Sequence, residues 1–254
     1  MERPHRADKK QEEKIGFKMA NKEKPYSYLK NSTIEKESIK LLESFGKDKG
    51  QEVAAPVPVF DIIEHLGYDY DFRKDGIYED KNILGGLLIT QKKVEINENL
   101  TDHEGRMHFT AAHETGHIVL HAPFYFEQMA AGQLEISSND SEMDILCRKD
   151  AGFEGAKKEP EEWQADKFAA YLLMPSALVK KAFFKNYKRP VNVRRKSILQ
   201  LFFPKPAFVK GYRIAEQVMR DGKFDNVSKM AMLNRLIGMR LVKGLSYQKS
   251  NATQ

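Results

Sequence analysis

The chain has 254 residues, of which 41% are hydrophobic and 31% charged, and its formal net charge is +6. This length allows one sizeable hydrophobic core with a small appended unit and excludes three ordinary domains. The single cysteine, Cys147, excludes an intrachain disulfide framework and a thiolate-rich zinc site. The N-terminus lacks the apolar core of a signal peptide, and no stretch approaches the roughly 18 apolar residues that span a bilayer. We therefore expect a cytoplasmic protein without a membrane partner.

The charge is unevenly distributed and divides the chain into three regions. Residues 1–50 carry 13 basic and 9 acidic side chains, and we interpret them as a polar basic arm followed by a first helix. Residues 51–177 carry 11 basic and 24 acidic side chains, a net charge of −13, whereas residues 178–254 carry 18 and 3, a net charge of +15. Such asymmetry suggests different partners for the two larger regions.

The first helix is predicted to begin at Ser32, since Ser32 and Glu35 have the spacing of a capping box. Gly46 is the expected end of this helix. The apolar side is expected to consist of Ile39, Leu42 and Phe45. After a linker, a second short helix should start beside Pro58 and end at Gly67.

Strand patterns follow this short helix. Tyr68 and Tyr70 alternate with aspartates, which is typical of a half-buried strand. The run LLITQKKVEIN after Gly86 predicts a hairpin. One face of the hairpin is expected to carry Leu87, Ile89, Val94 and Ile96. These patterns predict a short antiparallel sheet.

Helices dominate the rest of the chain. A capping-box pair, Thr101 and Glu104, predicts a long helix that runs to about residue 121. Residues 122–160 have weak periodicity and are expected to be a long loop or a partly ordered insertion. A helix over residues 160–173 should end before Pro175, because a residue that precedes proline avoids helical angles. The last helix is predicted to start at Ser228 and end near Gly238.

The sequence His113-Glu114-Thr115-Gly116-His117 lies inside the long helix. Positions i and i+4 are about 400° apart, so both imidazoles leave one face of the helix and can reach a single ion. Two such ligands suit tetrahedral Zn²⁺. Glu114 is displaced by about 100° and can act as a general base on the water that the metal activates. The simpler interpretation is a core helix with two incidental histidines.

A catalytic zinc site needs a third protein ligand. The metzincin class would supply a histidine six residues after the second one, but His121 follows His117 by only four, without an intervening glycine. A glutamate from a later helix is the gluzincin solution, and Glu162 opens such a helix one turn before Asp166. Acidic residues in a first turn also occur simply because they stabilise the helix dipole. Position alone therefore leaves the role of Glu162 open.

Four segments together resemble a known family. They are PVPVFDIIEHLG, LGGLLI, INENLTDHEGRMHFTAAHETGHIVLH and EEWQADKFAAYLLMP. They resemble the ImmA/IrrE family of metallo-endopeptidases, bacterial and phage proteins that cleave helix-turn-helix repressors, over roughly residues 50–180. The resemblance implies that Glu162 completes the metal site, with Glu161 as the fallback. It further implies that Asp166 orients a histidine through the free ring N–H.

This sequence departs from the family pattern at three points. Thr115 replaces the usual leucine of the motif, and His108 stands where the family often has arginine or glutamine. The interval between His117 and Glu162 is longer than in many members. These departures concern the fit of the substrate more than the binding of metal.

The basic region 178–254 admits three interpretations. The phrase NVSKMAMLNRLIGMRLV resembles the small helical, helix-turn-helix-like unit that follows the peptidase region in this family. Its positive charge can contact DNA phosphates, with Arg194, Arg195 and Lys196 as the residues to neutralise in a test. It can also dock on the acidic core as a solvated basic face, which we prefer, or recruit a repressor.

Other site residues are weaker candidates. An oxyanion stabiliser is expected because charge develops on the scissile carbonyl oxygen, and His121, Tyr125 and Tyr171 are the nominees. The simpler role for His121 is that of a helix-end histidine stabilised by the dipole. Trp163 is most simply a core aromatic residue next to the site, and Cys147 a small buried hydrophobic residue.

We conclude that the sequence predicts an α+β protein with a zincin-like metallopeptidase domain, a short antiparallel sheet beside the HExxH helix, and a small helical C-terminal unit. The expected function is zinc-dependent hydrolysis of a peptide bond in a helix-turn-helix repressor, although two histidines and a carboxylate also suit Mn²⁺. The alternative is a non-catalytic regulator with a structural metal, closed by His121 as a fourth ligand. The sequence indicates no particular oligomeric state.

Overall fold

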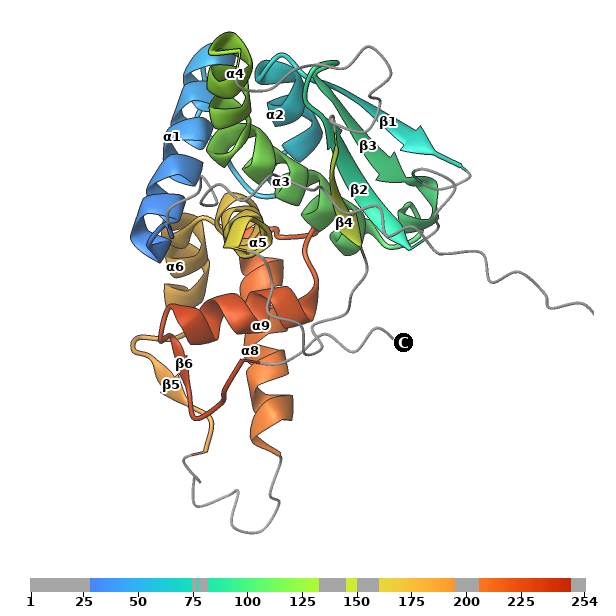
Figure 1. Cartoon of the computed structure of the whole chain (residues 1–254). Coiled ribbons are helices and arrows are strands. Elements are labelled where there is room, and N and C mark those ends of the chain that lie inside the picture. Colours follow the sequence, from blue (N-terminus) through green and yellow to red (C-terminus); the bar gives the residue numbers. More distant parts are fainter. Residues whose placement is uncertain are drawn as a thin grey trace, which may run out of the picture.

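A computed structural model describes residues 28–74, 77, 82–132, 145–149, 160–194 and 206–247, with 145–149 described for the backbone alone. The architecture is α+β, as predicted: one small sheet stands beside a group of helices, and the C-terminal helices lie below them (Figure 1).

The sheet is mixed, with strand order β1-β3-β2-β4. Its strands are β1 (Asp69–Arg73), β2 (Ile83–Leu88), β3 (Lys93–Asn97) and β4 (Ile145–Lys149). The predicted hairpin is confirmed, because β2 and β3 pair antiparallel and its four apolar residues are all buried. β4 also pairs antiparallel with β2, whereas β1 lies parallel to β3. The expected antiparallel arrangement therefore holds for the β2 pairs and not for β1.

The first helix, α1 (Asn31–Lys49), is longer than predicted at both ends. Lys30 is the N-cap and makes no side-chain capping bond, so the capping box at Ser32 is wrong. The helix passes through Gly46 and ends at Gly50, whose φ of 68° is left-handed. A methyl group on Gly46 would lie 2.7 Å from Gln51 O, so this glycine serves a close packing contact.

The buried face of α1 also differs from the prediction. Leu42 and Phe45 are buried as expected, but Ile39 is exposed and Ile34 and Leu41 take the inner positions instead. The helical period explains this change, because Ile34, Leu41 and Phe45 lie on one face, whereas Ile39, five positions after Ile34, is turned about 140° away from it.

The next two helices lie where the sequence predicted them. α2 (Val59–His65) follows Pro58, and Gly67 after it has a positive φ of 75°. α3 (Glu104–Leu120) has His103 at its N-cap without a side-chain bond, so the capping box at Thr101 is wrong. The hydroxyl of Thr101 instead donates to Glu98 O at the end of the short 3₁₀ turn η1 (Glu98–Leu100).

The region expected to be a long loop contains regular structure. α4 (Ala122–Ala130) begins directly after His121, which ends α3. Pro123 explains the break, because it lacks the N–H that would continue α3 and is well suited to the first turn of a new helix. Residues 145–149 form β4. A continuous loop is therefore wrong for these two stretches, whereas the alternative of a partly ordered insertion agrees with them; residues 133–144 and 150–159 lie outside the described residues.

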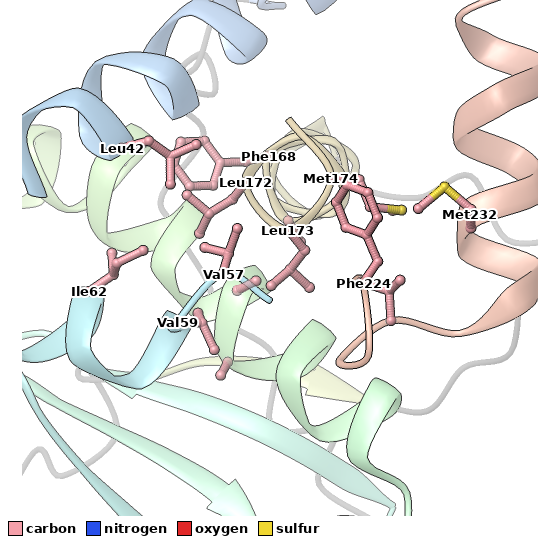
Figure 2. Close-up of a cluster of buried hydrophobic side chains, with 14 of the residues drawn as sticks. Leu42, Val57, Val59, Ile62, Phe168, Leu172, Leu173, Met174, Phe224 and Met232 are labelled. Carbon is pink, nitrogen blue, oxygen red and sulfur yellow. The ribbon is translucent and has the colours of Figure 1, made fainter. Parts of the chain in front are cut away.

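α5 (Pro160–Leu173) has the predicted bounds and occupies the centre of the fold. It packs against both α1 and α3 (Figure 1). Figure 2 shows its buried side chains meeting residues from distant segments. The labelled members of this core are Leu42, Val57, Val59, Ile62, Phe168, Leu172, Leu173, Met174, Phe224 and Met232. One continuous core therefore joins the N-terminal, central and C-terminal helices.

The C-terminal part is helical, as predicted. α6 (Ser176–Phe184) packs on α8 (Ala207–Gly222), and α8 packs on α9 (Lys229–Gly238). Ser228 is the N-cap of α9, and its hydroxyl accepts a hydrogen bond from Ala231 N, which confirms the predicted start. Two short parallel strands, β5 (Val191–Asn192) and β6 (Val242–Lys243), complete this part. The boundary expected after residue 177 falls inside α6, and the three-part division of the chain stays a prediction.

Among the described residues, no helix is both long enough and apolar enough to span a membrane.

Arg235 of α9 connects three segments that are far apart in the sequence. Its Nε donates to Met174 O at 3.0 Å, and its guanidinium pairs with Glu35 of α1. The guanidinium also lies over the ring of Tyr171, 4.5 Å from the ring centroid. Because Arg235 is buried, these contacts replace the water that the charge would otherwise need.

We expect Arg235→Met to lower the free energy of unfolding by about 2–4 kcal/mol, because it leaves Met174 O and Glu35 without their buried donor. Urea denaturation measures this loss. Arg213→Met, at an exposed position on α8, is the matched control and should change stability little. Equal losses in the two variants would show that Arg235 does not connect the helices.

Candidate metal and catalytic centre

The two motif histidines leave α3 on the same side and meet. His113 and His117 are buried, and their Nε2 atoms lie 3.1 Å apart. This geometry follows from the helix itself, which brings residues four positions apart to one face. The structure thus places both histidines where the sequence predicted.

Glu162 in the first turn of α5 reaches the same point. Its Oε2 lies 3.3 Å from His113 Nε2, and its Oε1 lies 3.3 Å from His117 Nε2. Burial raises the pKa of this carboxyl, but its interactions with the adjacent His113 and His117 rings outweigh burial and hold the pKa well below its usual range. Glu162 is therefore a carboxylate aimed between the two imidazoles.

A glycine allows α5 to approach α3 closely enough for this contact. A methyl group on Gly116 would lie 3.0 Å from Ala165 Cα and 3.2 Å from Ala165 O. Both atoms are backbone, so a larger residue would push the helices apart. Gly116 therefore sets the distance between the histidines of α3 and the glutamate of α5.

Asp166 holds His113 from the side opposite the shared Nε2 atoms. Its Oδ1 lies 3.0 Å from His113 Nδ1. A carboxylate can only accept, so His113 Nδ1 carries the proton, and the neutral form of the ring would present its Nε2 lone pair to the centre. This contact agrees with the orienting role that the family resemblance implied for Asp166.

His121 lies behind His117 and outside the group of converging ligand atoms. Its Nδ1 is 2.9 Å from His117 Nδ1, and its Nε2 is 3.4 Å from Gln164 Oε1. Burial, reinforced by the neighbouring His117, lowers the pKa of His121 to about 3. A neutral buried ring differs from the expected helix-end cation, because desolvation outweighs the helix dipole. Its contact with His117 Nδ1 also places it away from the position of a fourth ligand.

The three converging residues suit a divalent cation. Their ligand atoms all lie within 4.8 Å of one another, and each offers an electron pair to one point. Burial lowers the pKa of His117, which favours the neutral form that binds metals. Lone pairs brought together in a buried site repel one another unless a cation lies between them. The donor set therefore fits a metal with nitrogen and oxygen ligands, such as Zn²⁺.

Glu114 follows His113 directly on α3 and is fully buried. It leans against β2, where a methyl group on Gly85 would come within 2.8 Å of Glu114 Oε1 and 2.5 Å of Thr110 Cγ2. Gly85 thus leaves the space that the carboxyl group occupies. Sequence reasoning missed this role of Gly85, although a glycine inside a strand is a signal of close approach by a neighbouring group.

Tyr171 does not lie with the metal-ligand group. It follows Glu162 by nine positions on α5, which turns it to the opposite side of the helix, where its ring contacts Arg235. Tyr125, in α4, packs against the core beside Phe124. The position of Tyr171 does not support its nomination as an oxyanion stabiliser, whereas the nomination of Tyr125 stays a prediction.

Trp163 packs partly buried at the edge of the core, as predicted, and stacks on Tyr28 with ring centroids 5.2 Å apart. Glu161 is not part of the converging group, so the fallback ligand is not needed. Cys147 lies in β4, and its side chain is outside the described residues.

The departures from the family motif are accommodated locally. The hydroxyl of Thr115 donates to Ala111 O at 2.8 Å, so this buried polar group is bonded within its own helix. The Nδ1 of His108 lies 2.9 Å from Glu104 O, and its ring packs against Phe60 at 5.4 Å. Both side chains are thus directed to contacts other than the metal-ligand group.

Residues 71–192 match a family model, Peptidase_M78, described as the IrrE N-terminal-like domain. This segment is a domain of the M78 metallopeptidase family. The match confirms the resemblance to ImmA/IrrE metallopeptidases that the sequence motifs indicated. A comparison with curated proteins found no match. The M78 domain contains His113, Glu114, His117 and Glu162, whereas α1, α8 and α9 lie outside the matched range.

We expect Gly116→Ala to weaken metal binding by the M78 domain, because the new methyl group would move α5 and with it Glu162. Overpacking of this kind costs about 1–3 kcal/mol of stability. Competition with a chromophoric chelator measures the zinc affinity of the folded variant.

Gly105→Ala is the matched control on the same helix. Its methyl group would lie 3.0 Å from Ser228 N, so it introduces a similar strain away from the metal-ligand group. Stability should fall in both variants, but zinc affinity should fall only in Gly116→Ala. Unchanged zinc affinity in Gly116→Ala would contradict the role assigned to this glycine.

Proposed function

We propose that this chain is a zinc-dependent endopeptidase that hydrolyses a peptide bond in a cytoplasmic regulatory protein, a helix-turn-helix repressor. One observation carries the proposal: two imidazoles and a carboxylate bring their ligand atoms together at one buried point, in the same helix pair as a buried glutamate, inside an M78 metallopeptidase domain. A helix with two incidental histidines would not need a carboxylate from another helix placed 3.3 Å from both rings.

In this proposal His113, His117 and Glu162 hold the metal. A zinc ion bound there would supply Lewis-acid chemistry, polarising the scissile carbonyl group and activating water. Mn²⁺ accepts the same donor types. Asp166 keeps the His113 ring in the orientation in which Nε2 faces the centre.

Glu114 is the proposed general base and acid. It follows His113 directly on α3, so its carboxyl group is displaced by about 100° from the ligand face and stays free of the metal-ligand role. The carboxylate would accept a proton from the attacking water and deliver it to the leaving amine nitrogen. Packing against β2 at Gly85 fixes the carboxyl group for these two transfers.

The charge of the chain supports a basic substrate. The stretch 51–177, which contains all four proposed residues, has 11 basic and 24 acidic side chains. Opposite charge favours encounter with a DNA-binding protein, whose surface is basic. Together with the family resemblance, this favours a repressor over an acidic substrate.

The alternative is a non-catalytic regulator that binds a repressor or DNA through its basic C-terminal helices. The observation in its favour is that Arg213 and Arg220 of α8, and Lys223 at its end, are exposed. Arg194 is exposed as well, whereas Arg195 and Lys196 lie outside the described residues. This regulator would relieve repression without cleaving the repressor, so the repressor chain would keep its full length.

The proposed function predicts different defects for two variants. Glu114→Gln should bind zinc with nearly unchanged affinity but cleave about 10²–10⁴-fold more slowly, because an amide cannot accept the proton. His113→Ala should lose both zinc binding and cleavage. Purified helix-turn-helix repressors from the same genome, incubated with the zinc-loaded protein, are the substrates, and gel electrophoresis with mass spectrometry detects the cut.

A chelator is the third arm of this experiment. Chelation should stop cleavage by the wild-type chain, and added zinc should restore it. Cleavage that persists at the wild-type rate in Glu114→Gln or under chelator would rule out the peptidase mechanism. Repressor that stays intact but binds tightly to all variants would favour the non-catalytic regulator.

A further inference from the structure

We propose that the outer edge of β1 pairs antiparallel with β1 of a second copy of this chain, so that the two sheets join into one. β1 borders the sheet, and among the described residues β3 is its only neighbouring strand (Figure 1). Three of its five residues, Asp69, Tyr70 and Arg73, are exposed. The inference goes beyond the proposed function and does not depend on the metal centre.

The backbone of β1 keeps hydrogen-bonding groups for a second strand. Asp69 N donates to Lys92 O at 2.9 Å, so Asp69 directs its N–H toward β3. Neighbouring residues of a strand direct their N–H and C=O groups to opposite sides of the strand. Tyr70 and Phe72 therefore direct theirs to the outer edge. A strand edge with such groups is able to pair with a further strand.

The side chains of β1 limit the register of that pairing. Asp69, Asp71 and Arg73 lie on one face of the sheet. Tyr70 and Phe72 lie on the other face. Opposite residues of two paired strands point to the same face, so a shift by one residue is excluded. A two-fold axis at Asp71 brings every residue of β1 opposite a residue of β1 in the second copy.

This register also uses the outward backbone groups. Tyr70 lies opposite Phe72 of the second copy, and the two residues exchange N–H···O=C bonds as a hydrogen-bonded pair. An axis at Tyr70 would place Phe72 opposite Tyr68, whose N–H already donates to Ile63 O at 3.2 Å. An axis at Phe72 would leave Asp69 opposite residue 75, beyond the end of β1. The axis at Asp71 is therefore the favoured one.

The charges of β1 are complementary to those of a second β1 in this register. Asp69 of each copy lies opposite Arg73 of the other, which gives an ion pair on each side of the axis. The two Asp71 carboxylates meet at the axis, but in each copy Lys93 Nζ lies 3.1 Å from Asp71 Oδ2 and offsets their repulsion. Opposite charges across two strands stabilise the pair. Charges of one sign along β1 would instead repel a second copy.

The other face of β1 continues an aromatic cluster. The ring centroid of Phe60 in α2 lies 4.8 Å from that of Tyr70 and 5.9 Å from that of Phe72. Tyr70 is still 36% exposed, because it lies at the edge of the cluster. In the proposed pair, Phe72 of the second copy covers Tyr70, and the two clusters meet. Aromatic pairs across two strands stabilise an antiparallel sheet.

The first test is the mass of the full chain, measured by analytical ultracentrifugation from low to high micromolar concentration. We expect the mass to rise from that of one chain to that of two. Arg73→Asp should weaken the dimer about tenfold, because like charges then lie opposite on both sides of the axis. Asp69→Arg should weaken it for the same reason. A wild-type chain that stays monomeric at every concentration would overturn the proposal.

A mixture of these two variants tests the register. In a mixed dimer each introduced arginine lies opposite an introduced aspartate, and the native Arg73 of one copy lies opposite the native Asp69 of the other. The mixture should therefore dimerise about as well as the wild type, although neither variant does so alone. Asp225→Arg and Arg213→Asp, at exposed positions in the C-terminal part, are the matched controls and should each dimerise like the wild type.

A mixture that dimerises no better than its separate components, or an equal loss in the controls, would overturn the pairing. Zinc affinity should be the same in Arg73→Asp as in the wild type. If the dimer forms as expected but His113→Ala binds zinc like the wild type, the metal centre is wrong and the β1 interface stands.

Hydrogen exchange of single backbone amides, measured by NMR, tests the bonds directly. The N–H groups of Tyr70 and Phe72 should exchange more slowly in concentrated than in dilute protein. The N–H of Asp69, which donates to Lys92 O, should exchange equally slowly in both. If a dimer forms but Tyr70 and Phe72 exchange at the same rate at both concentrations, the dimer uses another surface and the proposal is wrong.

Discussion

The close contact between α3 and α5 is the constraint on which the rest of this structure depends. Gly116 lies against the backbone of Ala165, so the two helices approach more closely than side chains would normally allow. The same contact places Glu162 3.3 Å from both motif histidines and Asp166 3.0 Å from His113. A single packing contact therefore assembles ligand atoms and their supporting groups from segments more than forty residues apart in the sequence.

The other helices keep α5 in place for that contact. Its apolar face enters a core shared with α1, α2 and the C-terminal helices (Figure 2). Arg235 connects its C-terminal end to α1. Because these contacts hold α5, its first two turns present Glu162 and Asp166 to the histidines. Burying the carboxylates of Glu162 and Asp166 costs free energy, which a bound metal ion would offset. The M78 family match agrees with such a metal-binding role.

Sequence patterns gave correct predictions where the structure depends only on residues close together in the chain. The spacing of His113 and His117 fixes their common face on any α-helix, and the interval from Pro160 to Pro175 fixed the bounds of α5. The capping boxes predicted at Ser32 and Thr101 are wrong, because α1 and α3 start after Lys30 and His103. The capping preference of a single residue is weak, and the packing of the whole helix outweighs it. The glycines show the same limit, since Gly46 resembles a helix end but is a packing contact, whereas Gly50 ends the helix.

The sequence by itself determined the α+β class, the HExxH pair and the acidic character of the region around it, because each depends on neighbouring residues or on composition. Only the tertiary structure decided that Glu162 meets both histidines, that Gly85 makes room for Glu114, and that His121 lies behind His117. These contacts join residues on different helices and strands, or depend on which ring nitrogen faces which neighbour. Such distances are set by how closely two elements pack, and no pattern along one segment specifies that.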